Sequence, residues 1–104
     1  MTIAKATLGL TPAAIYTSTS NTAVTFLSLC NFTSTATTIN LYIVPNGSSA
    51  DNTTLVYSNL QLTAHDTYQL YLGGEKLLLS AGDAIYATAT SISSVTSITS
   101  YTTI

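Results

Sequence analysis

The segment 38–44 alternates between polar and apolar side chains, and this alternation constrains the fold more than any other sequence feature. Its apolar members, Ile39, Leu41 and Ile43, fall on one face of an extended backbone. A helix with one buried face would repeat about every 3.6 residues instead. The composition agrees, because Thr, Val, Ile and Tyr favour strands and dominate the chain, whereas good helix formers are rare. We therefore expect an all-β fold.

Turn signals divide the chain into short apolar segments. The clearest are Pro45, which lacks an N–H group, the following Asn46-Gly47, and Gly73-Gly74. The segment 22–32 is apolar on both faces and predicts a central strand covered on both sides. The expected strands are 14–17, 22–32, 38–44, 55–62, 67–72, 75–79, 84–90 and 95–103.

About seven to eight short strands in one small chain predict a single antiparallel β-sandwich or jelly-roll-like domain. A small barrel is the alternative. The sandwich is assigned to residues 21–104. Residues 1–20 are expected to form an N-terminal arm with the first short strand, able to reach a neighbouring subunit.

Charged residues make up only 6% of the 104 residues, and the formal net charge is −2. Two lysines, Lys5 and Lys76, cannot follow a phosphate backbone, so nucleic acid is excluded as a partner. No apolar run is long enough for a membrane span. A surface of Thr, Ser, Asn and Gln repels neighbours weakly and suits a protein packed against other proteins. A secreted or heat-tolerant domain with a neutral coat is the alternative.

Two short segments, 60–66 and 77–83, share the pattern Leu-x-Leu-(Thr/Ser)-Ala-x-Asp. Each aspartate is expected to close a corner by accepting backbone N–H groups. The only histidine, His65, lies in the first corner and is expected to be a solvated turn residue. Asp66 and Asp83 form a catalytic pair only if the two corners are neighbours; capping is the other interpretation. Because capping is the favoured interpretation of both aspartates and the histidine is expected in a turn, we expect that the protein is not an enzyme.

No cofactor or metal site is expected, because the chain has one histidine, one cysteine and no Asp-rich loop. Cys30 lies in the most apolar segment and is expected to be a buried free thiol. Three Asn-x-(Ser/Thr) triplets, at Asn31, Asn46 and Asn52, are attributed to the abundance of threonine and serine.

The seven tyrosines are spread over most of the expected strands. Tyr42 and Tyr71 are out of phase with their apolar neighbours and are expected to face outward. Tyr42, Tyr71 and Tyr86 are therefore the predicted interface residues, since outward tyrosines suit protein contacts. Stacking on a sugar is the rival interpretation, and plain strand propensity explains them equally simply.

From about residue 22 to the end, the order of elements resembles that of small β-sandwich virion proteins of tailed bacteriophages. The segments that carry the resemblance are FLSLCN at 26–31, LYIVPNG at 41–47, LGGEKL at 72–77 and LSAGDAIYA at 79–87.

The resemblance implies a virion structural protein without catalytic residues, made in the host cytoplasm. Its expected role is a capsid decoration or cement protein that forms a symmetric oligomer, expected to be a homotrimer, and binds a major capsid or tail protein. A tail, fibre or baseplate component is the first alternative, and a carbohydrate- or receptor-binding module is the second.

Overall fold

The computed structural model describes residues 2–70, 77–90 and 94–104, and within them all regular structure is β-strand. The all-β prediction is therefore confirmed. The described strands are β1 (Thr2–Thr7), β2 (Ala13–Thr17), β3 (Thr22–Asn31), β4 (Thr37–Val44), β5 (Leu55–Leu62), β6 (Thr67–Leu70), β7 (Leu77–Leu79), β8 (Ala84–Ala89) and β9 (Val95–Thr103).

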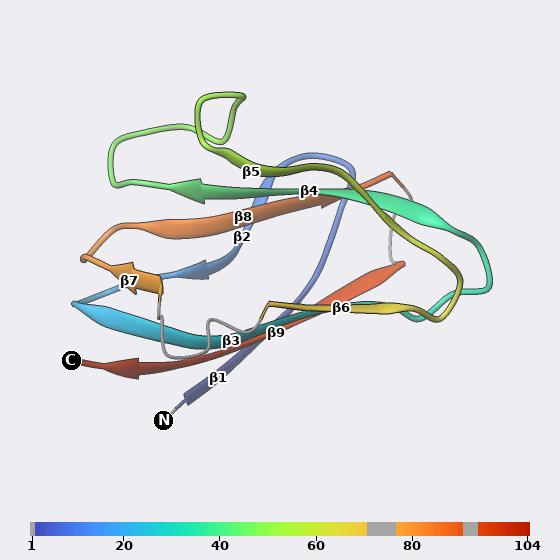
Figure 1. Cartoon of the computed structure of the whole chain (residues 1–104). Helices are drawn as coiled ribbons and strands as arrows, with labels where there is room; N and C mark the ends of the chain where they lie inside the picture. Colours follow the sequence, from blue (N-terminus) through green and yellow to red (C-terminus); the bar gives the residue numbers. More distant parts are fainter. Residues whose placement is uncertain (1, 71–76, 91–93) are drawn as a thin grey trace.

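The strands form two antiparallel sheets that pack face to face (Figure 1). Sheet A has the order β1-β9-β3-β6, with β7 also paired to β3, and sheet B has the order β2-β8-β4-β5. The pairing is nested: β1 pairs with β9, β2 with β8, β3 with β6, and β4 with β5. This is a long antiparallel hairpin wrapped into two layers, which is the jelly-roll arrangement, with β7 as an addition. The sandwich prediction is confirmed.

The hydrophobic core lies between the sheets and follows the period-two pattern of the sequence. In β4 the buried Ile39 and Leu41 lie opposite Ala89 and Ala87 of β8, which belong to the same core. Sheet A contributes Val24, Leu27 and Leu29 from β3, Leu79 from β7 and Val95 from β9.

The expectation that β3 is covered on both sides is corrected. β3 is central in its sheet, since β9 lies on one side and β6 and β7 on the other. Its outer face is only half-buried at Phe26, Ser28 and Cys30. The pairing with β9 shifts by one residue between Val24 and Phe26, so Val24 and Leu27 both face the core although they are three positions apart.

The first twenty residues are built into the sandwich rather than projecting as a free arm. β1 pairs along its whole length with β9, and β2 pairs with β8, so the segment supplies one edge strand to each sheet. Leu8, between them, is 2% exposed and belongs to the core. The sequence pattern missed β1 because Ile3 and Lys5 alternate only with alanines, which carry little strand signal.

Candidate functional site

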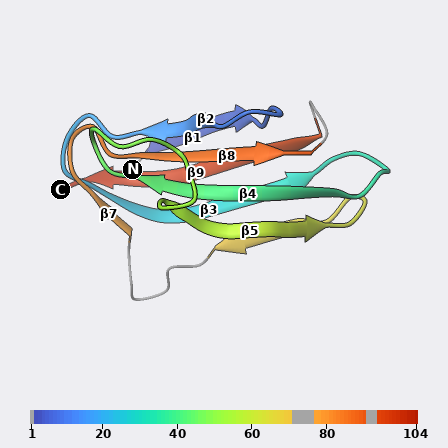
Figure 2. The ribbon, with the colours of Figure 1, turned by 90° about the horizontal axis from the view of Figure 1, so that it is seen from above.

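The predicted interface residue Tyr42 lies on the outer face of sheet B, opposite Tyr86 of β8. Tyr42 is nevertheless only 8% exposed, so the expectation that it is available to a partner is corrected. Alternation gives the face on which a side chain lies but not what packs over it, and the β4–β5 connection, residues 45–54, passes over the outer face of sheet B (Figures 1 and 2). Tyr86 is half-buried. Tyr71 lies outside the described residues.

Four other tyrosines join the two sheets. The rings of Tyr16 in β2 and Tyr101 in β9 have centroids 4.3 Å apart. Tyr57 in β5 and Tyr68 in β6 meet edge to face at 5.6 Å. The hydrogen bond between their hydroxyls raises the pKa of Tyr57 above its usual value. These pairs join the two sheets along opposite long sides of the sandwich (Figure 2), and all four rings pack against the core.

The two repeated corners have the same geometry. In both, the N–H of the closing aspartate donates to the carbonyl of the first corner residue, over 3.0 Å in 63–66 and 3.1 Å in 80–83. The third residue has a positive φ in each case, 57° at His65 and 90° at Gly82. The first corner leads from sheet B to sheet A and the second leads back. His65 is thus a turn residue at a position that glycine fills in the other copy.

Asp66 and Asp83 do not form a pair. The Asp66 carbonyl accepts the N–H of Asn31 at the end of β3, whereas the Asp83 carbonyl accepts the N–H of Ser18 before β3 begins. The ten residues of β3 separate the two sites by roughly 30 Å. The interpretation of both aspartates as caps is confirmed, because Asp83 accepts the backbone N–H groups of Asn46 and Ser80, each at 2.9 Å, and Asp66 accepts that of Thr67.

The hydrogen bonds from the backbone N–H groups of Asn46 and Ser80 hold the pKa of Asp83 below its ordinary value, and the bond from Asn46 contributes most. The described residues contain no cluster of three or more His, Cys, Asp or Glu side chains with metal-binding geometry. Within the same part of the chain, no helix has the length and hydropathy to cross a membrane.

Cys30 is half-buried rather than buried, which corrects the sequence prediction. It lies opposite Thr96 of β9 and Thr67 of β6. Its position follows from the register shift in β3 described above, which places the 26-28-30 set of side chains on the outer face.

An apolar cavity of about 180 Å³ lies between the sheets, lined by Val24, Leu27, Leu41, Ile43, Val56, Tyr57, Leu77 and Ile85. It is smaller than the ~300 Å³ from which small-molecule sites usually begin. Its lining is almost entirely apolar, so it offers few polar groups to orient a ligand. We interpret it as part of the sandwich interior.

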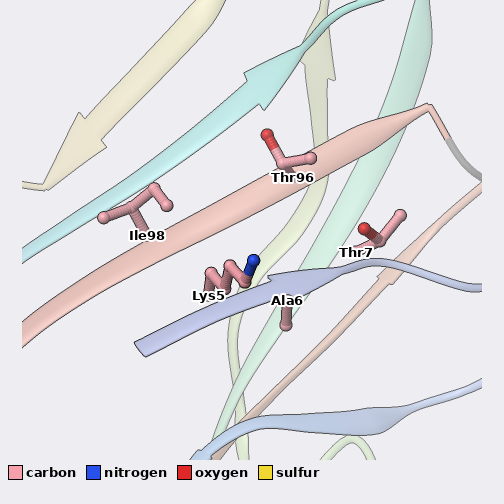
Figure 3. A pocket seen from close by; sticks show the side chains of 5 residues that line it. All are labelled: Lys5, Ala6, Thr7, Thr96 and Ile98. Carbon is pink, nitrogen blue, oxygen red and sulfur yellow. The ribbon is translucent and has the colours of Figure 1, made fainter. Parts of the chain in front are cut away.

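The outer face of sheet A beside β1 is the surface that sequence reasoning missed. Lys5 stands beside Thr96 and Ile98 of β9, and Ala6 points to the opposite side of β1 (Figure 3). An open hollow of about 430 Å³ is lined by residues Lys5, Ala6, Thr7, Thr96 and Ile98. Ile3, next along β1, is 68% exposed, and Ile98 is 36% exposed. Once residues 2–7 are known to form a strand, the alternation of Ile3, Lys5 and Thr7 with alanines places these three side chains on one face.

Comparisons with protein-family models, with curated proteins and with solved structures find no match to this chain.

Proposed function

We propose that this protein is a non-enzymatic structural component of a virus particle, most specifically a capsid decoration or cement protein that acts as a symmetric homo-oligomer. The observation that carries the proposal is the nearly uncharged exterior of a small jelly roll. Seven large apolar side chains are exposed among the described residues: Ile3, Leu10, Phe32, Val56, Leu78, Ile98 and Ile104. With six charged side chains in the whole chain, little electrostatic repulsion opposes contact between copies.

The fold adds support by analogy. Jelly rolls recur in viral capsid proteins and also in lectins, so the analogy bears on the class of protein and not on a residue. A cement protein stabilises a shell by mass action, because it binds the assembled lattice and not its separate subunits. Such a role needs a rigid, chemically bland domain. It does not need the perturbed histidine, nucleophile or metal cluster of an active site.

The decisive experiment compares particles that carry this protein with particles assembled without it. Both are heated in parallel and the release of nucleic acid is followed with a dye. Particles without the protein are expected to open at lower temperature, and adding back the purified protein should restore the higher value. An unrelated small protein of similar net charge is the control for the add-back. Equal opening temperatures would remove the cement role.

The number of copies per particle distinguishes a head protein from a tail protein. Quantitative gel densitometry of purified particles is expected to give hundreds of copies for a shell protein. A few to a few dozen copies would favour a tail, fibre or baseplate component. Binding of purified protein to a glycan array, abolished by Tyr86→Ala, would instead favour the carbohydrate-binding alternative, because Tyr86 of sheet B is only half-buried.

A further inference from the structure

A sandwich of two open sheets has free edges, and each free edge exposes unpaired N–H and C=O groups to other chains. Both edges of sheet B carry features that oppose pairing. β2 follows Pro12 and has a register shift between Ala14 and Tyr16. β5 has two register shifts against β4 and a positive φ at Asn59. On the far edge of sheet A, the structure describes β6 only as far as Leu70 and β7 only from Leu77.

β1, the other edge of sheet A, carries no such backbone feature. Its six residues pair with β9 without any register shift, and no proline interrupts it. Figure 2 places it along one long side of the molecule, with β2 on the same side in the other sheet. The feature of β1 that opposes pairing with another strand is the charge of Lys5.

The register shows which groups of β1 are available. The N–H of Leu8 donates to the carbonyl of Val95 directly opposite, so this is a hydrogen-bonded pair of the antiparallel ladder. Ala6 and Ala4, which lie two and four residues before Leu8, likewise direct their N–H and C=O groups toward β9. The residues between them, Ile3, Lys5 and Thr7, therefore direct their N–H and C=O groups to the free edge.

We propose that β1 pairs antiparallel with β1 of a second copy of this chain, about a two-fold axis at Ala4. In this register Lys5 lies opposite the partner copy's Ile3, and Ile3 lies opposite the partner copy's Lys5. The two pairs form four backbone hydrogen bonds. Each exposed Ile3 is covered by the aliphatic stem of a lysine.

The strand is self-complementary in a way that selects both the partner and the register. Ala4 lies opposite its own symmetry mate in a non-hydrogen-bonded pair, where Cα atoms approach to about 4.5 Å and a small side chain fits. A two-fold axis at Lys5 would place two ammonium groups directly opposite each other, which destabilises a pair. An axis at Ala6 would leave Ile3 facing Gly9, whose carbonyl already accepts the N–H of Ala89 in sheet B.

The inference rests on the self-association assumed in the proposed function, but not on the virus particle. It also changes the expected oligomer from a trimer to a dimer. An isologous contact of this kind closes at two copies, whereas a trimer needs a heterologous contact. Its test uses the purified protein alone, so that it can fail while a role in the virion stands.

Two substitutions at one position isolate the backbone contact. Lys5→Thr and Lys5→Pro both remove the charge, but only proline also removes the N–H that faces the free edge. That N–H is not part of the β1–β9 ladder, so the fold should tolerate proline there. Sedimentation equilibrium over a wide concentration range should give a dimer for the wild type. Lys5→Thr should also dimerise, and Lys5→Pro should dimerise at least about tenfold more weakly than Lys5→Thr.

Amide hydrogen exchange supplies a second readout at single residues. The amides of Ile3 and Lys5 should gain protection as the protein concentration rises, while circular dichroism checks that both variants remain folded. A wild-type monomer at all concentrations, with these amides unprotected, would show that Lys5 keeps the edge unpaired and would overturn the proposal. A trimer, or equal association of the two variants, would overturn it as well and leave self-association through another surface.

Discussion

Asn31 is the polar side chain whose removal should cost the fold most. It ends β3 and is 0% exposed. Its amide nitrogen donates to the carbonyl oxygens of Thr35, Leu62 and Thr63, at 2.9, 3.3 and 3.2 Å. Its amide oxygen accepts the N–H and the hydroxyl of Thr33, at 3.0 and 2.8 Å. One side chain thereby joins the β3–β4 connection to the end of β5.

The substitution Asn31→Leu keeps the approximate size and removes every one of these bonds. A typical buried hydrogen bond contributes about 1 kcal/mol net, and a buried acceptor left unpaired costs about 1–3 kcal/mol. The hydrogen bond to the Leu62 carbonyl is buried, so this carbonyl would be left without a partner in the variant. The other partners of Asn31 are only partly buried and can hydrogen-bond to water instead. We expect the free energy of unfolding to fall by about 3 kcal/mol, a large part of the ~5–15 kcal/mol of a small domain.

Urea unfolding followed by circular dichroism measures this change, and the thermal midpoint should fall by roughly 10–20 °C. Asn52→Leu is the matched control, because Asn52 is exposed in the β4–β5 connection, and it should change stability by less than about 0.5 kcal/mol. If Asn31→Leu costs less than about 1 kcal/mol, the reasoning that this amide organises one end of the sandwich is refuted.

Three further predictions test local features of the fold. Thr99→Val should raise the free energy of unfolding by about 1 kcal/mol in urea titrations, because the Thr99 hydroxyl is buried and without a hydrogen-bond partner. Gly82→Ala should lower the free energy of unfolding by about 1–2 kcal/mol, since φ of Gly82 is positive and a Cβ there would lie 2.5 Å from the Asn46 side chain. His65→Gly should not lower it, because glycine adopts a positive φ without strain. Asp83→Asn should flatten the loss of stability in acid. The folded-state pKa of Asp83 lies below 3.8, so its contribution is complete above that pH and is lost as pH falls through the lower folded value.

The corners show what could be predicted locally. The pattern shared by 60–66 and 77–83 predicted two aspartate-closed turns, and both exist with matching backbone hydrogen bonds. The prediction worked because each corner is closed by a backbone hydrogen bond between residues only three positions apart, Asp66 to Thr63 and Asp83 to Ser80. Whether Asp66 and Asp83 lie together could not be read in this way, because that depends on the path of β3 between them.

The candidate surfaces, by contrast, could not be predicted from neighbouring residues alone. The phase of Tyr42 was predictable from alternation, but its low exposure was not, because exposure depends on which distant parts of the chain pack over a side chain. The face beside Lys5 was missed, because Ile3 and Lys5 become significant only when β1 is known to be an edge strand.

The amino-acid sequence alone determined that this chain is all-β, where its main strands and turns lie, and that its exterior is almost uncharged. These properties depend on side-chain alternation, turn chemistry and composition, which act over a few neighbouring residues. The tertiary structure decided the nested strand pairing, the free edge of β1 and the burial of Asn31 and Tyr42. Each of these requires contacts between residues far apart in the chain, and a period-two pattern specifies a face but never the strand that will lie beside it.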